Sequence, residues 1–170
     1  MAAGKTAQAV QVETFVDGSA LSGVIAKTGV AIAQYETWFQ TWLTELNPQL
    51  SPLNAYELSL RLTTDAEIQQ LNADFRQQNK PTDVLSFAAL ETELPQADSI
   101  YQTQPVYLGD IIISAETAAR QALESQHSLE KELAWLSAHG LLHLLGWDHP
   151  DQSSLTRMLS QQTQLLNLIS

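Results

Sequence analysis

The sequence contains no cysteine, few basic residues and no long apolar run, and each absence excludes a class of protein. Without cysteine, disulfides and thiolate metal ligands are excluded. Only 8 residues are lysine or arginine against 19 aspartates and glutamates, and the net charge of −11 argues against broad, nonspecific attraction to nucleic acid. No apolar run reaches transmembrane length, and the amino terminus lacks the basic-then-apolar pattern of a secretory signal. We therefore expect a cytoplasmic location and no membrane partner.

The composition is otherwise that of an ordinary globular protein. With 170 residues, 44% of them hydrophobic, and no low-complexity tract, the chain is long enough to bury a sizeable core. Residues 1–8 are polar and predict a flexible amino terminus. Residues 9–170 are expected to form a single domain.

Apolar periodicity and turn residues divide this domain into strands and helices. Strands are predicted at residues 9–16, 57–62, 84–88 and 107–113, and helices at 30–46, 64–77, 114–125, 128–145 and 151–169. Thr64 with Glu67 predicts a capping box, and Ser114 and Asp151 are expected to cap later helices. An acidic segment at 91–104 is predicted to be an exposed loop. The pattern indicates an α+β domain with a small mixed four-stranded sheet packed with about five helices.

Three of the four histidines lie in one short segment, residues 139–149. His139 and His143 are four residues apart, so on a helix their rings project from one face. Gly146 can adopt a left-handed conformation, which would end the helix and bring His149 back toward the other two rings. Three imidazoles without cysteine suit Zn²⁺ and leave a fourth position for water. The segment predicts one zinc ion at a helix end; the alternative is that the histidines only cap and solvate that end.

The same offsets occur in metalloproteases whose helix has the pattern His-Glu-x-x-His-x-x-Gly-x-x-His. In those enzymes the glutamate after the first histidine is the general base. This chain has Gly140 at that position. The ligand geometry is therefore expected without the base that a peptidase needs.

Four separated blocks of the sequence, taken together, resemble one family. They are residues 67–72 leading to Arg76, 81–87, 108–114 and 139–149. On these blocks the chain is similar to the YbeY-type endoribonucleases over roughly residues 57–150. The resemblance implies a zinc-dependent, single-strand-specific endoribonuclease involved in maturation of the 16S rRNA 3′ end and in ribosome quality control. It implies single-stranded rRNA and the small ribosomal subunit, or proteins associated with it, as partners.

The resemblance also implies roles for particular residues. By the family's motif, His139, His143 and His149 would be the metal ligands, and Arg76 would be the basic residue needed for RNA cleavage. A guanidinium presents a planar fork of donors that matches phosphate oxygens; the alternative is an ordinary surface arginine. The family usually has tyrosine where this chain has Trp147.

Five further residues are candidates for the surroundings of the metal. Lys80 could extend the basic patch, although a solvated loop lysine is the alternative. Thr82, Asp83 and Ser86 could line the cleft, with Asp83 alternatively fixing the turn into its strand. Asp148 could accept the second ring N–H of a ligating histidine, or simply cap the turn.

Glu132 is a further residue that could lie near the histidines. It lies two turns before His139 on the same side of its helix and could border the pocket.

The sequence also leaves alternatives for the function. Besides the ribonuclease, the sequence allows a metal-dependent hydrolase of another substrate, such as a peptide, and a noncatalytic zinc-containing ribosome assembly factor. The acidic composition predicts weak binding of free RNA, so that efficient action would depend on ribosomal particles or partner proteins.

Overall fold

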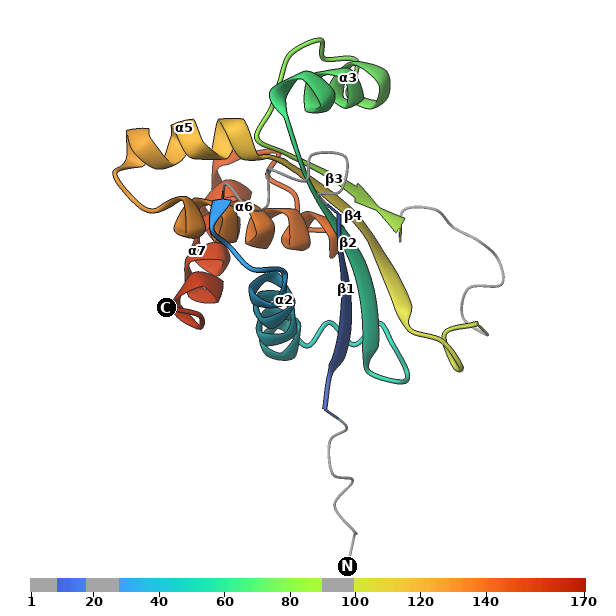
Figure 1. Ribbon diagram of the computed structural model, residues 1–170. Helices are drawn as coiled ribbons and strands as arrows, with labels where there is room; N and C mark the ends of the chain where they lie inside the picture. The colour runs from blue at the N-terminus through green and yellow to red at the C-terminus, as the bar shows by residue number, and fades with distance from the viewer. Residues whose placement is uncertain (1–8, 18–27, 90–99) are drawn as a thin grey trace, which may run out of the picture.

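In the computed structural model, residues 9–17, 28–89 and 100–170 are described, and they form a mixed sheet with helices packed around it (Figure 1). The elements are β1 (Gln11–Asp17), α2 (Ile32–Leu46), β2 (Ala55–Thr63), α3 (Asp65–Arg76), β3 (Val84–Ala88), β4 (Val106–Ser114), α5 (Ala115–Ser125), α6 (Leu129–Leu144) and α7 (Gln152–Asn167). The predicted α+β class is confirmed. The flexible amino terminus expected at 1–8 and most of the acidic loop expected at 91–104 lie outside the described residues. Within the described ranges, no helix is long and apolar enough to cross a membrane.

The four strands lie in the order β1-β2-β4-β3. β1, β2 and β4 run parallel to one another, whereas β3 is antiparallel to β4. Because β3 pairs on one side only, it forms an edge of the sheet, and α6 packs against both β3 and β4. This order brings the histidine-bearing helix next to the edge strand.

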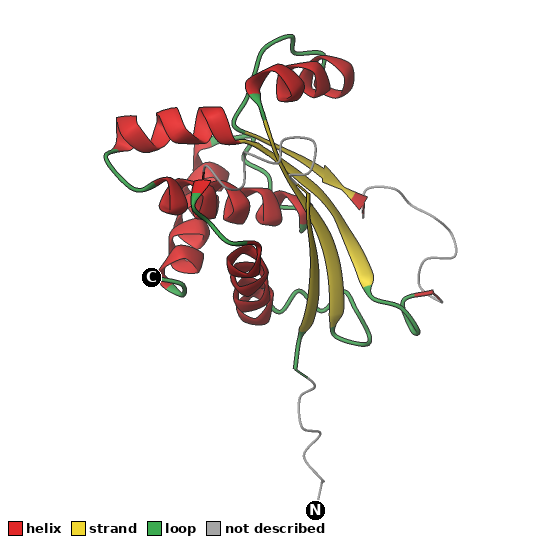
Figure 2. Cartoon of the chain, viewed as in Figure 1, coloured by secondary structure: helices red, strands yellow, loops and turns green. Residues whose placement is uncertain are grey.

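The main core lies between one face of the sheet and helices α2, α6 and α7 (Figures 1 and 2). In β2, alternate residues point to this face, and Leu58, Leu60 and Leu62 are fully buried there. A stripe of aromatic residues at helical spacing on α2 lies in the core: Phe39 and Trp42 are 0% exposed. Full burial of a side chain such as Phe39 contributes about 1.5–3 kcal/mol, so this stripe anchors α2 to the sheet.

Helix α3 packs on the opposite face of the sheet. Its Ile68 forms a small buried cluster with Leu85 of β3 and Ile112 of β4, which are paired across the two strands. Leu71 and Phe87 pack against this cluster. The carboxyl end of α3 is thereby held beside the edge strand.

The start of α3 differs in one detail from the capping box expected at Thr64 and Glu67. The Thr64 hydroxyl accepts a hydrogen bond from the Glu67 backbone N–H at 3.4 Å, as predicted. The Glu67 carboxylate, however, accepts from the Thr63 hydroxyl at 2.6 Å and pairs with Arg61. The reciprocal half of the box was wrong because strand β2 offers this carboxylate a closer donor and a positive charge.

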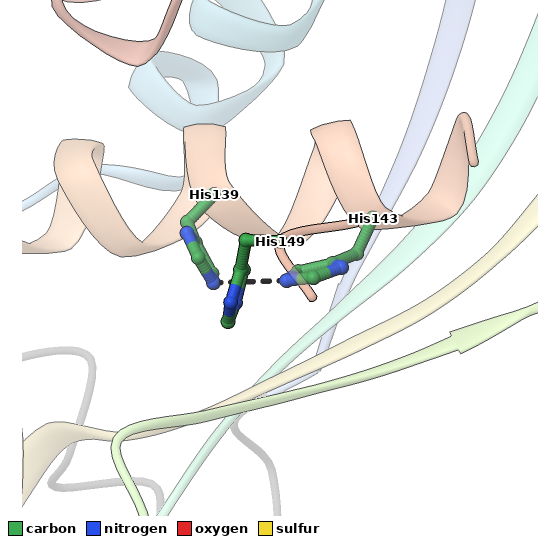
Figure 3. Close-up of side chains that lie close together, drawn as sticks. All are labelled: His139, His143 and His149. Atoms are coloured by element: carbon green, nitrogen blue, oxygen red, sulfur yellow. Dashed lines mark hydrogen bonds between the residues drawn. The ribbon is translucent and has the colours of Figure 1, made fainter. Parts of the chain in front are cut away.

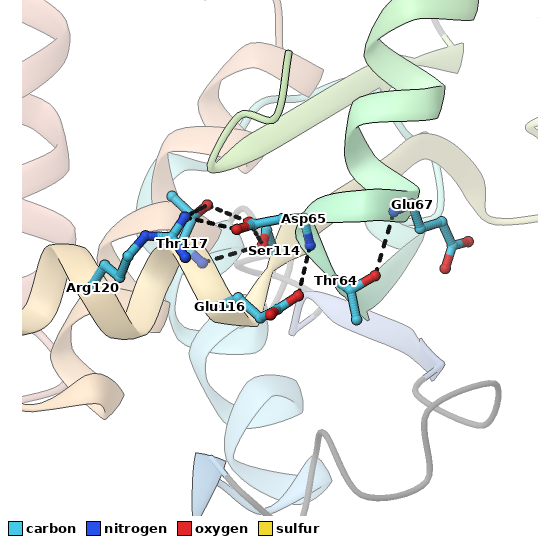
Figure 4. A network of polar contacts seen from close by, with 7 residues as sticks. All are labelled: Thr64, Asp65, Glu67, Ser114, Glu116, Thr117 and Arg120. Atoms are coloured by element: carbon cyan, nitrogen blue, oxygen red, sulfur yellow. Dashed lines mark hydrogen bonds and ion pairs between the residues drawn. The ribbon is translucent and has the colours of Figure 1, made fainter. Parts of the chain in front are cut away.

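A polar network joins the amino termini of α3 and α5 (Figure 4). The Asp65 carboxylate accepts from the hydroxyls of Ser114 and Thr117 at 2.6 Å each and pairs with Arg120 at 2.8 Å. In return, Glu116 accepts from the Asp65 backbone N–H at 2.9 Å. Burial acts to raise the pKa of Asp65, but these hydrogen bonds and the guanidinium outweigh it and lower that pKa. The network fixes α3 against α5, and with it the position of Arg76 at the end of α3.

The last helix has the capping box that α3 lacks. The Asp151 carboxylate accepts from the Ser154 backbone N–H at 2.7 Å, and the Ser154 hydroxyl accepts from the Asp151 backbone N–H at 3.2 Å. The prediction of Asp151 as the cap is confirmed. This start follows directly on the histidine segment, so it limits where the chain can go after His149.

Candidate metal centre

The turn at the end of α6 brings the histidine segment back on itself. Gly146 has φ +93°, in the region that favours glycine, as the sequence predicts. Its N–H donates to the His143 carbonyl at 3.0 Å, and the Trp147 N–H donates to the Leu142 carbonyl at 3.0 Å. These two bonds are those of a Schellman motif, which closes the helix and reverses the chain.

The three predicted histidines meet in front of this turn (Figure 3). The Nε2 atoms of His139 and His143 lie 3.0 Å apart, and the ring centroids of His143 and His149 are 5.4 Å apart. One nitrogen from each of the three rings lies within 4.8 Å of the others. His139 and His143 are partly buried, whereas His149 is exposed. Three nitrogen donors at this spacing, open to solvent on one side, could hold a metal ion with room for a further ligand.

A glutamine that the sequence does not single out orients the first histidine. Gln162 of α7 is fully buried, and its amide nitrogen donates to the Trp135 carbonyl at 2.9 Å. This bond places Oε1 of Gln162 3.3 Å from Nδ1 of His139. Since Oε1 can only accept, the His139 proton belongs on Nδ1, and the lone pair of Nε2 points toward the other two rings.

His143 contacts His139 directly. Nε2 of His143 lies 3.0 Å from Nε2 of His139, a contact that Figure 3 marks as a hydrogen bond. With the His139 proton on Nδ1, Nε2 of His143 is the donor. A cation held between these two nitrogens would take the place of that proton.

Burial favours the neutral form of two of these rings. It is the largest cause lowering the pKa of His139, and it outweighs the opposite effects of Gln162 and Asp83. Burial also lowers the pKa of His143, and the neighbouring His139 and His149 rings add to the decrease. Since a metal ligates the neutral imidazole, the folded protein presents both rings in the state that binds.

His139 and His143 open into a cleft of about 470 Å³. Arg76 of α3 and Ser86 of β3 lie in its lining, together with His139, His143 and Asp148. The exposed Arg76 donates through Nη2 to the Ser86 carbonyl at 2.7 Å. Its guanidinium also lies over the Phe87 ring, 5.4 Å from the centroid. The structure therefore brings Arg76 into one cleft with His139 and His143, which are more than 60 positions away in the sequence.

The remaining predicted residues near β3 behave differently from one another. The Ser86 hydroxyl donates to the Gly140 carbonyl at 3.2 Å and so ties β3 to α6. Asp83 accepts from the Val84 backbone N–H at 2.8 Å and from the Thr82 hydroxyl at 3.4 Å, so it fixes the turn into β3. Thr82 and Asp83 are not among the lining residues of the cleft. The alternative of a structural role for Asp83 is the one that the geometry supports.

Three further residues, Lys80, Asp148 and Glu132, make contacts other than those that the sequence suggests for them. Lys80 is exposed, lies outside the cleft lining and contributes its carbonyl to the buried Asn72 amide at 2.9 Å. Asp148 lines the cleft, but its carboxylate accepts from the His149 backbone N–H at 2.8 Å rather than from a histidine ring. Glu132 does not border the pocket, because it is buried at the other end of α6 and pairs with His127.

Close packing of α6 on β4 requires glycine at position 140, where the metalloprotease pattern has glutamate. A Cβ at this position would lie 2.7 Å from Cγ2 of Ile111 on β4, closer than real Cβ contacts come. Helix α6 therefore approaches the sheet more closely than a glutamate at position 140 would permit. The absence of the peptidase base follows from the way this helix packs.

The mixed sheet and the histidine cleft define a class: α+β proteins with an open three-histidine site, at the end of a buried helix, that could hold a metal ion. Comparison with known proteins then gives the family. The family model described as Endoribonuclease YbeY matches residues 24–170. The chain belongs to this family.

Individual relatives agree with this assignment. The chain is 55% identical over 157 residues to the "Endoribonuclease YbeY" of a Nostoc species, covering 92% of this chain and 84% of the relative. It is 51% identical over 168 residues to the protein of the same name from a Synechocystis species, covering 97% and 92%. The solution structure of a Thermotoga maritima protein, 22% identical, superposes with a TM-score of 0.56 over 94% of this chain and 89% of that one. This last similarity concerns the fold alone.

Proposed function

We propose that this protein is a zinc-dependent endoribonuclease that cleaves single-stranded ribosomal RNA, in maturation of the 16S rRNA 3′ end and in ribosome quality control. The observation that carries the proposal is a cleft lined by Arg76, His139 and His143, beside which His149 brings a third histidine nitrogen within 4.8 Å of the other two, in a chain of the YbeY family. A role on ribosomal RNA implies action in the cytoplasm, where ribosomes assemble.

The donor set supports zinc as the metal. In a tetrahedral zinc shell with bonds of about 2.0 Å, two nitrogens lie about 3.3 Å apart. The Nε2 atoms of His139 and His143 are 3.0 Å apart, and His149 supplies a third nitrogen. When bound, zinc supplies Lewis-acid chemistry, lowering the pKa of a coordinated water and offsetting negative charge at a phosphate.

Arg76 is proposed to hold the scissile phosphate. A guanidinium carries five N–H donors, so its bond to the Ser86 carbonyl leaves others for phosphate oxygens. That bond, with the Phe87 ring beneath the guanidinium, restricts the side chain before substrate arrives. A positioned positive charge stabilises the extra negative charge that gathers on phosphate in the transition state.

The acidic composition supports a requirement for ribosomal partners. With 8 basic residues in all, the chain cannot neutralise many phosphates at once, so affinity for free RNA should be low at physiological salt. We propose that the small ribosomal subunit, or proteins associated with it, presents the single-stranded substrate to the cleft.

The proposal is tested with a single-stranded fragment of ribosomal RNA and, in parallel, with small-subunit particles that carry unprocessed rRNA. Wild type is compared with His143→Ala and Arg76→Ala, and zinc content is measured by atomic spectroscopy. We expect His143→Ala to lose both zinc and cleavage, because it removes a ligand. Arg76→Ala should retain zinc and lose at least about tenfold in kcat/KM, because it removes phosphate binding only.

Arg157→Ala is the matched control, because it removes an exposed arginine of α7 that lies outside the cleft lining. It should cleave like wild type. Equal cleavage by wild type and His143→Ala would point to a contaminating nuclease and contradict the proposal. A zinc-loaded wild type that cleaves neither substrate would contradict it as well.

A further inference from the structure

A second cavity, of about 840 Å³, borders β3 next to the metal cleft. Leu85 and Phe87 of β3 both pack toward α3, and Leu85 lines the metal cleft whereas Phe87 lines the second cavity. Leu71 and Phe75 of α3 also line it. In Figure 1, α3 lies beyond one end of the sheet, near the start of β3. The second cavity and the metal cleft therefore meet along β3 and the end of α3.

An aromatic pair with one open ring lies at this boundary. Phe75 is 62% exposed, which is unusual for a large apolar side chain next to a cavity. Its ring meets that of Phe87 edge to face, with centroids 5.4 Å apart and an angle of 70°. The guanidinium of Arg76 lies on Phe87, 5.4 Å from the ring centroid. Phe75, Phe87 and Arg76 thus form one continuous surface that reaches from the second cavity into the metal cleft.

We propose that Phe75, supported by Phe87, is a stacking surface for a base of the RNA strand whose phosphate Arg76 holds. The inference rests on the proposed ribonuclease function and adds a positioning residue for the substrate. A nucleotide presents both a flat apolar base and an anionic phosphate, and the surface presents an open ring and a guanidinium on adjacent residues of α3. The strand would pass across β3, with its phosphate in the metal cleft and a neighbouring base on Phe75.

The charge of the protein favours this mode of recognition. Few basic residues are present to bind phosphates, whereas stacking of a base on an aromatic ring needs no charge and accepts every base. Stacking on Phe75 also requires a base that is not already paired within a duplex. The contact therefore selects single-stranded RNA without reading its sequence.

Binding is tested directly with a short single-stranded RNA in which one base is replaced by 2-aminopurine, whose fluorescence falls when it stacks. The fluorescent base is moved one position at a time along the strand, and the protein is the complete chain with a chelator present to prevent cleavage. We expect quenching at one or two adjacent positions. Phe75→Leu, which keeps an apolar side chain but removes the ring, should abolish the quenching and weaken binding by about 5- to 100-fold. Phe75→Tyr should restore both.

Cleavage kinetics provide the second readout. A base contact made equally before and during the reaction changes KM and leaves kcat unaltered, so Phe75→Leu should raise KM by the same factor. Leu123→Ala is the matched control, since it removes a side chain that is 80% exposed on α5 and outside both cavities. It should match wild type, and all variants should retain their metal.

The outcomes separate this inference from the function on which it rests. Wild-type cleavage with an unchanged KM in Phe75→Leu, and quenching that survives this substitution, would overturn the stacking surface and leave the ribonuclease proposal intact. No cleavage by metal-loaded wild type would overturn the ribonuclease proposal. In that case the 2-aminopurine signal still decides whether Phe75 binds a base, because quenching requires binding alone.

Discussion

Replacing Gln162 by leucine should weaken metal binding without unfolding the protein. The glutamine is fully buried and holds Nδ1 of His139 at 3.3 Å, which directs the Nε2 lone pair toward the other two histidines. Leucine has a similar volume but no acceptor, so the ring is free to rotate or to exchange its proton between the two nitrogens. The Trp135 carbonyl that loses the glutamine amide lies in the middle of α6 and can still accept within that helix.

The size of the effect follows from these contacts. Loss of an outer partner of a ligating histidine reduces metal affinity by about 10- to 100-fold, or about 1.4–2.7 kcal/mol. The metal-free protein should also be less stable by about 1–3 kcal/mol, because Nδ1 of His139 is left without a partner in a partly buried site. In a chain of 170 residues each kcal/mol lowers Tm by about 2–4 °C.

Zinc affinity is measured by competition with a chromophoric chelator at pH 7.5, and Tm is measured on the metal-free protein. Gln164→Leu is the control, since it makes the same substitution at an exposed position of the same helix. It should bind zinc like wild type. If Gln162→Leu also binds zinc with wild-type affinity, then the glutamine does not set the orientation of His139, and the argument from its hydrogen bond is refuted.

Three other predictions concern packing, capping and pH. Gly140→Ala should lower Tm despite alanine's better helix propensity, because the new Cβ meets Ile111 at 2.7 Å and overpacking costs about 1–3 kcal/mol; a raised Tm would contradict this contact. Asp151→Ala should destabilise the protein through loss of the α7 cap, measured as a lower midpoint of urea unfolding, whereas Asp151→Asn should retain most of the wild-type stability. The lowered pKa values of His139 and His143 mean that, as pH falls below about 6.5, the unfolded chain binds protons before the folded one does. The metal-free protein should therefore lose stability between pH 7 and pH 5.5, and a variant with glutamine at both positions should lose less over the same range.

Several elements follow from local patterns and could be predicted without a structure. Helix α2 has apolar and aromatic residues at helical spacing, and most of its buried face follows from that spacing. Ile32, which has the same spacing, is 43% exposed. The caps at Ser114 and Asp151 depend on hydrogen bonds to residues three positions away, so they too can be found in the sequence. The capping box at Thr64 was only half correct, because the partner that Glu67 chooses belongs to a strand.

The histidine segment by itself determined the relative placement of its three rings. A spacing of four within a helix and a glycine after the last turn are local properties, decided by helix geometry and by the conformations open to glycine. The resemblance in four separated blocks likewise belongs to the sequence and agrees with the family assignment.

Only the tertiary structure decided which residues surround these rings. Gln162 reaches His139 because α7 packs on α6, and Arg76 reaches the cleft because α3 and β3 pack together at the edge of the sheet. The close approach of Gly140 to Ile111 is likewise a contact between distant segments. Such contacts depend on which faces of helices and strands are buried against one another. Periodicity shows that a face is apolar, but it does not specify the element that covers that face.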